Sequence, residues 1–424
     1  MLEKVSLFQT KRDFFNFFLL ACFLLSISLS IEYYNFTQLT KFDSQLVDAT
    51  VLKQYSKTKV KKGKLKTYQV LKLKSHSGFT FYTTASKTLK DIKFRDVTME
   101  IWAGKISFYE YMRSFYAFSK ILKIHENPTY KSKLNTLISK QHKSQDITLV
   151  YQALFTAKPL PIKLQQVFST LGISHLIAIS GFHLSVLSGI LFFLIKFPYK
   201  FLQKRFFPYR SFTVDSFIFI AISLLVYMLF LDMPPSLLRA FVMLIVGFTL
   251  YDRGVKIISM QTLFLTIILI LVIFPRLCFN IGFWLSVAGV FYIFLFLLSS
   301  EGRSKLWKLL MLPLWLYFTM LPYSIVIFAN FSIYHPLSII WTALFTLFYP
   351  IAIFLHLIGN GNLFDPLLSL LMNLKTHMVT IEIDFKFLLI EIGLSLMSIY
   401  SKLFLYALIL YLFGFFIYTI NNVT

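Results

Sequence analysis

The feature that most limits the possible folds is a succession of apolar runs, each about 20 residues long, that fills the chain after Leu164. A helix of this length crosses the hydrocarbon core of a bilayer and satisfies its own backbone hydrogen bonds there. Hydrophobic residues make up 57% of the 424 residues, which is more than a soluble domain could bury. The sequence therefore predicts a polytopic α-helical membrane protein.

We expect a first span near 14–31 and further spans near 172–195, 212–231, 236–251, 257–274, 279–299, 309–329, 337–358 and 403–420. Basic residues in short loops mark the cytoplasmic side of a membrane protein. Such residues lie in the loop 196–211, at Arg253 and Lys256, and between Arg303 and Lys308. They predict a multi-pass protein of the cytoplasmic (inner) membrane, with its N-terminus in the cytoplasm and residues 32–165 on the periplasmic side.

Residues 1–31 have two interpretations. The apolar run is long and has no Ala-x-Ala site, which favours an uncleaved N-terminal transmembrane anchor. Small residues at its end (Ser26, Ser28 and Ser30) leave a cleaved signal peptide as the alternative.

Residues 32–165 form the one sizeable polar segment and carry most of the positive charge. They hold 24 Lys and Arg against 9 Asp and Glu, a net charge of +15 out of +23 for the whole chain. An excess of this size indicates a polyanion or an anionic membrane surface, including the lipid bilayer itself, as a partner.

The first part of this segment has the alternation of β-strands. Between Lys64 and Lys74, alternate residues form a mostly basic face and a more apolar face, and Lys62-Gly63 is typical of a hairpin turn. Two more strand-like runs follow, at 78–84 and 96–104. Short strands at this spacing predict a small OB-like β-barrel over residues 32–105. A polar helical connector is expected over 106–165, followed by the transmembrane domain over 166–424.

The strand lysines alternate with aromatic residues, among them Phe79, Phe81 and Tyr82. Single-stranded nucleic acid is held by phosphate attraction together with base stacking, although edge strands also carry lysine simply to prevent aggregation. We favour nucleic-acid contact, with these candidate residues: Lys57, Lys59, Lys61, Lys64, Lys66, Tyr68, Lys72 and Lys74.

The run Gly172–Phe193 (GISHLIAISGFHLSVLSGILFF) is apolar enough to enter a bilayer, yet it carries polar groups. In hydrocarbon such groups usually face a bundle interior or a wet cavity. Gly181, Ser185 and Gly189 are four residues apart, which predicts a helix face where another backbone comes close. His175 and His183 would lie on the same helix, either lining a pore or simply bonded to neighbouring helices.

A second motif, Met233–Arg239 (MPPSLLR), places Arg239 about one turn inside a predicted span. This arginine could extend its side chain to the interface, bind phosphate, or pair with Asp232. In a third motif, Gly282 and Ser286 repeat the four-residue spacing of a close-packing face.

The sequence gives little support for catalysis, metal binding or disulfide formation. Ser180 lacks a Gly-x-Ser-x-Gly context and a nearby Asp, and no carboxylate or thiol stands at ligand spacing from the histidines. Cys22 and Cys278 cannot build a disulfide framework. We therefore expect no catalytic residue, no metal site and no cofactor.

Three segments, GISHLIAISGFHLSVLSG (172–189), PSLLRAFVM (235–243) and FPRLCFNIGFWLSVAGV (274–290), resemble the ComEC family of competence proteins in order and spacing. The resemblance implies a channel that passes single-stranded DNA across the inner membrane during natural transformation. Many members also have a metallo-β-lactamase-like nuclease domain, whose His-x-His-x-Asp-His motif is absent here. The chain is thus expected to be a short form without nuclease activity.

For this function the candidate channel-lining residues are His175, Ser180, Gly181, His183, Ser185, Ser236, Arg239 and Ser286. The resemblance also implies a periplasmic DNA receptor, a cytoplasmic helicase and single-stranded-DNA-binding proteins as partners. The sequence leaves open whether the protein forms a homo-oligomer. One alternative is a small-solute transporter, which would need a carboxylate at the membrane midplane, whereas Asp215 and Glu391 are expected near span ends. The other is a membrane-embedded hydrolase that uses Ser180, His175 and His183.

Overall fold

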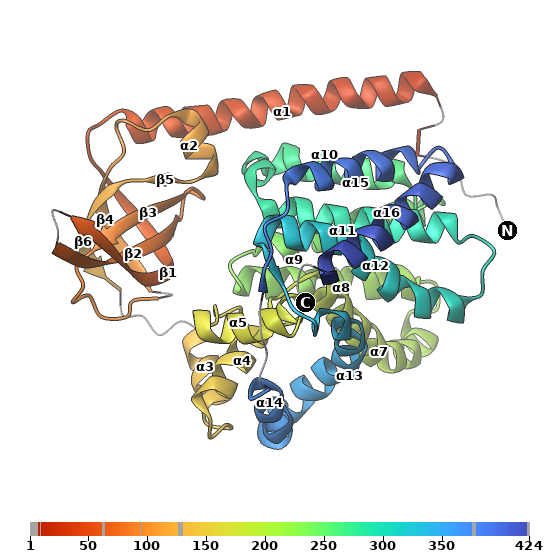
Figure 1. Ribbon diagram of the computed structural model, residues 1–424. Helices are drawn as coiled ribbons and strands as arrows, with labels where there is room; N and C mark the ends of the chain where they lie inside the picture. The colour runs from red at the N-terminus through yellow and green to blue at the C-terminus, as the bar shows by residue number, and fades with distance from the viewer. Residues whose placement is uncertain are drawn as a thin grey trace. The chain divides into compact units, whose positions relative to one another are not determined.

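The computed structural model describes residues 7–8, 10–61, 64–93, 95–125, 130–374 and 379–421, and for residues 60, 61 and 64–66 it describes the backbone alone. The chain divides into two compact units. The sheet unit comprises residues 10–129 and 268–281, and the helical unit comprises residues 1–9, 130–267 and 282–424. Figure 1 shows the elements of each.

Helix α1 (Lys11–Thr40) is longer than the expected first span. A capping box starts it: the Asp13 N–H donates to Thr10 Oγ1 at 3.1 Å, and the Thr10 N–H donates to Asp13 Oδ2 at 3.0 Å. Its C-terminal end belongs to the sheet unit, where Leu39 is buried in the core and Phe36 packs against it. The helix therefore continues from the apolar run directly into the sheet unit.

The sheet unit contains one six-stranded sheet, in the order β5-β3-β2-β1-β4-β6. The strands are β1 (Gln45–Lys61), β2 (Lys64–Ser75), β3 (Thr80–Ala85), β4 (Asp96–Trp102), β5 (Phe115–Tyr116) and β6 (Phe118–Ile124), with helix α2 (Phe108–Arg113) before β5. All neighbouring pairs are antiparallel except β3 with β5. This strand order does not by itself show a closed barrel.

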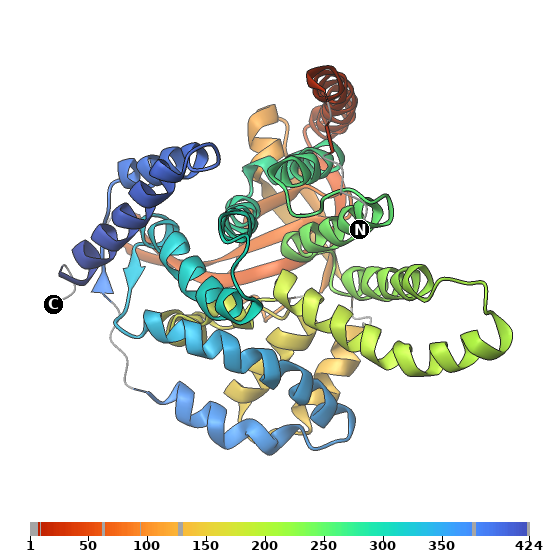
Figure 2. The same cartoon turned by 90° about the vertical axis from the view of Figure 1, so that its right-hand side faces the viewer.

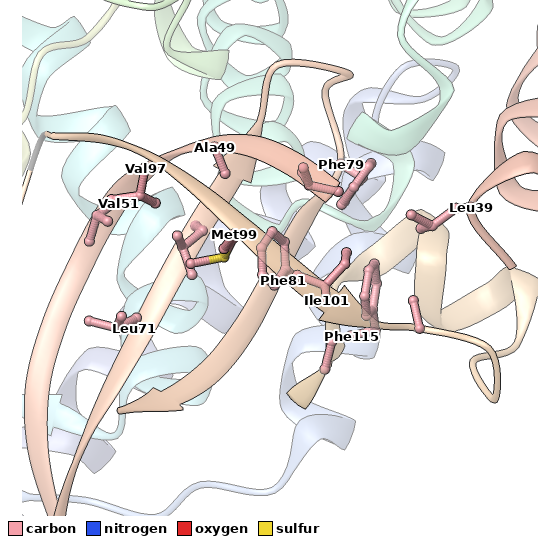
Figure 3. Packing of buried hydrophobic residues seen from close by; sticks show 14 of the residues in the cluster. Leu39, Ala49, Val51, Leu71, Phe79, Phe81, Val97, Met99, Ile101 and Phe115 are labelled. Atoms are coloured by element: carbon pink, nitrogen blue, oxygen red, sulfur yellow. The ribbon is translucent and has the colours of Figure 1, made fainter. Parts of the chain in front are cut away.

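The core of the sheet unit follows the predicted alternation. In β2, Leu71 and Leu73 are fully buried, while Lys72 lies half-buried between them. Phe81 of β3 stacks on Phe115 of β5 with ring centroids 5.9 Å apart, as Figure 3 shows for the labelled side chains. The apolar side chains on one face of the strands thus stabilise the sheet by burial.

The prediction of a helical connector over 106–165 holds for helix α2 but is wrong for the residues that follow it. Residues 115–124 form strands β5 and β6 and complete the sheet. Phe115 and Ala117 are buried while Tyr116 and Phe118 are exposed, which is the period of two of a half-buried strand. After α2, the next helix begins at Tyr130.

The helical unit contains α3 (Tyr130–Ser139), α4 (Gln145–Thr156), α5 (Ile162–Thr170), α6 (Ser174–Ile177), α7 (Gly181–Phe206), α8 (Phe212–Phe230), α9 (Pro235–Asp252), α11 (Ile281–Ser299), α12 (Lys305–Phe328), α13 (Ser338–Leu357), α14 (Asp365–Met372), α15 (Phe385–Met397) and α16 (Lys402–Asn421) (Figure 2). Helix α10 (Met260–Ile273) is divided between the helical unit and the sheet unit, and the 3-10 helix η1 (Pro275–Phe279) belongs to the sheet unit.

Eight helices within the described residues are long and apolar enough to cross a membrane: α1, α7, α8, α9, α11, α12, α13 with the preceding 3-10 turn η2 (His335–Leu337), and α16. These match eight of the nine expected spans. The ninth, near 257–274, contains α10, an apolar helix of 14 residues, which falls short of the ~20 residues that a bilayer crossing requires.

The connector helices α3 and α4 are part of the helical unit. His142, between them, places its Nδ1 2.9 Å from Asp365 Oδ1 and its Nε2 3.0 Å from His356 Nε2. The His142 ring also stacks on Tyr151 of α4 at 4.5 Å. Fully buried Tyr151 and Leu154 lie in the same cluster as Phe345 of α13. This packing ties the connector to α13 and α14.

Candidate functional site

The apolar character of segment 172–189 predicted a single helix. That prediction is wrong, because the helical conformation is interrupted between α6 and α7. Helix α6 ends at Ile177, and Ala178 and Ser180 have extended backbone conformations before α7 begins at Gly181. His175 and His183 consequently lie on different helices, and their expected positions around a single helix are wrong.

Ser180 and His183 form the N-terminal cap of α7. The Ser180 N–H donates to His183 Nδ1 at 3.2 Å, and Ser180 Oγ lies at the same distance from that nitrogen. Backbone N–H groups at a helix start lack intrahelical partners, and this contact supplies one. His183 is 0% exposed and packs against the rings of Phe345 and Tyr349. Its Nε2 has no hydrogen-bond partner in the described part of the chain.

The first and second motifs meet at the start of α9. Ser236 donates its hydroxyl hydrogen to the Ile179 carbonyl oxygen at 2.8 Å. A Cβ atom added at Gly181 would lie 3.0 Å from the Cβ of Ala240. The predicted close approach is therefore confirmed at Gly181, where the small residue lets α7 contact α9. At Gly189 an added Cβ would meet no described atom within 4 Å.

The second and third motifs meet at Arg239. Its side chain is buried, and Nη1 donates to the carbonyl oxygens of Gly282 and Phe283, both at 2.6 Å, while Nε donates to that of Pro235 at 3.1 Å. Asp232 instead forms an ion pair with Lys131. Arg239 thus joins the start of α9 to the start of α11. It is neither extended to the interface nor paired with Asp232.

These contacts bring together the N-terminal ends of α7, α9 and α11. We call residues 178–181, 235–240 and 282–286 the N-terminal junction. A helix N-terminus carries partial positive charge, and anions are stabilised beside it. Three such ends and one guanidinium group therefore favour negative charge at the junction.

The remaining predicted lining residues lie at or beside the junction. His175 and Ser185 are exposed, and Ser286 is half-buried on α11. His175 Nε2 lies 3.4 Å from Thr342 Oγ1, and Ser185 donates to the carbonyl oxygen of Gly181 at 3.0 Å. Sequence reasoning missed Thr342, because a lone threonine in an apolar helix gives no signal.

The predicted DNA-binding lysines divide between two parts of the sheet unit. Residues 57–61 of β1 and 64–68 of β2 pair with each other, and no third strand of the described sheet pairs with them. We call this two-stranded ribbon the basic arm. Lys57 and Lys59 are exposed on it. The backbones of Lys61, Lys64 and Lys66 are also in the arm, whereas their side chains and the turn at 62–63 lie outside the described residues.

Lys72 and Lys74 lie in the body of the sheet and are half-buried, as is Tyr68 of the arm. The Lys72 ammonium lies 5.3 Å from the Tyr82 ring centroid, a cation–π distance.

Two aromatic residues expected to help hold nucleic acid do not lie on the surface. Phe79 and Phe81 are buried core residues at 4% and 0% exposure. Exposed aromatics on the strands include Tyr55, Trp102, Tyr116 and Phe118, of which Trp102 and Phe118 are cross-strand partners on β4 and β6. The alternation of residues 115–121 carried the signal for the last two.

The apolar helices and the buried contacts between them define a polytopic α-helical membrane protein. A family model described as Competence protein matches residues 156–422, which is more than half of the chain, and the chain belongs to that family. Membership supports a ComEC-like competence protein with a role in competence and DNA uptake. Comparisons with curated proteins and with solved structures gave no match.

Proposed function

We propose that the protein is a channel that carries single-stranded DNA across the cytoplasmic membrane during natural transformation. The observation that carries this proposal is the convergence of three segments, far apart in the sequence, at the N-terminal junction of a competence-family bundle. A lipid-facing anchor would need no such assembly of helix ends and buried polar groups.

In this proposal the junction lowers the cost of bringing a phosphate backbone into the membrane. Arg239 and the N-terminal ends of three helices supply positive potential where hydrocarbon would otherwise exclude a charge. Ser185 and His175, both exposed, offer hydrogen bonds that a passing strand can exchange. Arg239 contributes its charge while its hydrogen bonds to the carbonyls of Gly282 and Phe283 keep it in place.

The sheet unit would receive DNA on the periplasmic side, with the N-terminus in the cytoplasm. The basic arm supplies phosphate contacts, and exposed Trp102 and Phe118 offer faces on which bases stack. We also propose that the sheet closes into an OB-like barrel. Only Ala117 separates β5 from β6, and its N–H donates to the Tyr82 carbonyl oxygen at 3.0 Å. Strands β5 and β6, which stand at opposite ends of the strand order, are therefore nearly continuous along the chain.

The proposal requires no chemistry on the DNA by this chain. Delivery of DNA, degradation of the second strand and pulling from the cytoplasm would fall to partners: a periplasmic receptor, a helicase and single-stranded-DNA-binding proteins.

The test follows labelled DNA in cells that lack the gene and in cells complemented with variants. Without the gene, DNA should accumulate outside the cytoplasmic membrane and be absent from the cytosol. Wild type and Arg253→Ala, a change in an exposed loop residue, should restore entry, and Arg239→Ala should not. DNA that still reaches the cytosol of the deletion strain would show that the channel assignment is wrong.

One observation favours the solute-transporter alternative. Glu391, expected near a span end, is 0% exposed inside the helical unit and faces Tyr292 of α11. Solute uptake by vesicles that contain the purified protein, lost in Glu391→Gln, would support that function. The hydrolase alternative predicts that Ser180→Ala abolishes function while Arg239→Ala is tolerated.

A further inference from the structure

Glu391 is a fully buried carboxyl group in the membrane bundle that plays no part in the proposed DNA path. It lies on α15 and contacts Tyr292, a residue eleven positions after the start of α11 and seven before its end. At ~1.5 Å per residue, Tyr292 is about 10 Å or more from either end of that span. An ionisable group at such a position is expensive and usually functional.

The contacts of Glu391 form a short chain of hydroxyl groups. The Tyr292 hydroxyl donates to Glu391 Oε1 at 3.0 Å, and it lies 2.9 Å from Ser395 Oγ and 3.4 Å from the Tyr323 hydroxyl. Tyr292 can accept the Ser395 hydrogen while it donates its own to the carboxyl. One oxygen of Glu391 is thus satisfied by a neutral donor.

The second oxygen, Oε2, is buried and has no hydrogen-bond partner among the described residues. The surrounding elements offer tyrosines and apolar groups: Tyr292 of α11, Tyr323 and Trp315 of α12, and Tyr411 of α16. Tyr411 already donates to the Phe387 carbonyl oxygen at 2.7 Å. Within the described residues no Lys, Arg or His forms an ion pair with Glu391.

The protonation state of Glu391 follows from the free-energy cost of burying each of its two forms. A buried hydroxyl without a partner costs about 1–3 kcal/mol, whereas an isolated carboxylate in a low-dielectric interior costs far more and takes up a proton instead. A carboxyl with one neutral hydroxyl donor and no cation is therefore more stable as the acid.

We propose that Glu391 is a proton-binding site of the helix bundle. A proton from water binds at Oε2 and converts the carboxylate into a neutral carboxylic acid, while Oε1 continues to accept the Tyr292 hydrogen. The site is independent of DNA, and its test does not use DNA transfer.

Infrared spectroscopy of the full-length protein in lipid vesicles tests the proposal, because the C=O stretch of a protonated carboxyl is separate from the bands of a carboxylate. At neutral pH the wild type should show this band. Glu391→Gln should lack it, and Glu301→Gln, in an exposed loop, should retain it. Tyr292→Phe should shift the band, because it removes the donor to Oε1.

A wild-type spectrum at neutral pH without a protonated-carboxyl band would overturn the proposal. So would a band that persists unchanged in Glu391→Gln. If Glu391→Gln does not fold, Tyr292→Phe decides: a shifted band supports the site, and an absent or unshifted band contradicts it.

Discussion

Ser236, the second residue of α9, donates its hydroxyl hydrogen to the carbonyl oxygen of Ile179, which lies in the break between α6 and α7. The two residues are 57 positions apart. Their contact satisfies a carbonyl group that the break leaves without a helical partner. It also holds the start of α9 beside the start of α7, where Gly181 approaches Ala240.

Removal of this hydroxyl should weaken the junction. Ser236→Ala leaves the Ile179 carbonyl without its partner and should destabilise the protein by about 1 kcal/mol. Ser223→Ala is a matched control, because Ser223 is half-buried like Ser236 but donates within its own helix to the Phe219 carbonyl oxygen. Thermal unfolding in detergent measures both, and equal melting temperatures for the two variants would contradict a role of Ser236 in joining the motifs.

Arg239 should be required for stability as well as for its charge. Arg239→Ala removes the donor to two carbonyls of α11 and should cost about 1–3 kcal/mol. Arg239→Lys keeps the charge but not the planar fork, so it should recover only part of the loss. Arg253→Ala, on an exposed loop, should change the free energy of unfolding by less than about 0.5 kcal/mol. An unchanged melting temperature for Arg239→Ala would count against the described contacts.

DNA binding through the basic arm should depend on salt. Each phosphate contact to a single strand contributes about −0.7 to the slope of log affinity against log salt concentration. Lys57→Ala with Lys59→Ala should therefore flatten the slope of the full-length protein in lipid nanodiscs by about 1.4. Lys196→Ala with Lys200→Ala, in the helical unit, is the control and should not change the slope. Affinity of the wild type that is insensitive to salt would contradict the electrostatic role of the arm.

Gly172 is required both for its backbone conformation and for space. Its φ of +72° is unfavourable for other residues, and an added Cβ would lie 3.1 Å from the Cα of His335. Gly254 has a φ of +70° but no described atom within 4 Å of an added Cβ. Gly254→Ala should therefore cost about 1–2 kcal/mol from the backbone alone, and Gly172→Ala about 1–3 kcal/mol more from crowding. Chemical unfolding compares the two, and equal losses would refute the close contact with His335.

The capping box of α2 should weaken in acid. The Ser107 N–H donates to Glu110 Oε2 at 2.8 Å, and this bond to the charged form lowers the pKa of Glu110. The stabilisation is therefore present above the ordinary pKa of glutamate and is lost as the pH falls through the lowered value. Hydrogen exchange of the α2 amides should accelerate in acid in the wild type. Glu110→Gln should show a smaller dependence on pH, and an identical dependence would contradict the prediction.

The sequence predicted the helices from run length alone and the sheet from alternation. Both patterns are local, since a bilayer span needs about 20 apolar residues and a half-buried strand needs a period of two. Leu71, Leu73 and Lys72 lie where that period predicts. Residues 115–124 were missed because lysines and serine dilute the same signal.

The candidate site was less predictable than the elements that carry it. The sequence indicated Gly181 as a point of close approach, but Ala240 as its neighbour followed from the tertiary structure. The sequence indicated that the charge of Arg239 is costly to place inside a membrane span. It did not indicate that the carbonyl oxygens of Gly282 and Phe283 accept hydrogen bonds from this side chain. The sequence predicts Glu391 near a span end, because residues 359–402 have no clear apolar run.

The sequence by itself determined the class of membrane protein, the basic polar segment and the three motifs, because each depends on residues close together along the chain. Only the tertiary structure decided that α7 begins at Gly181, that the three motifs share one junction, and that Glu391 is buried against Tyr292. These features depend on which helices pack together, and the free energy of that packing comes from contacts between residues that no local pattern links.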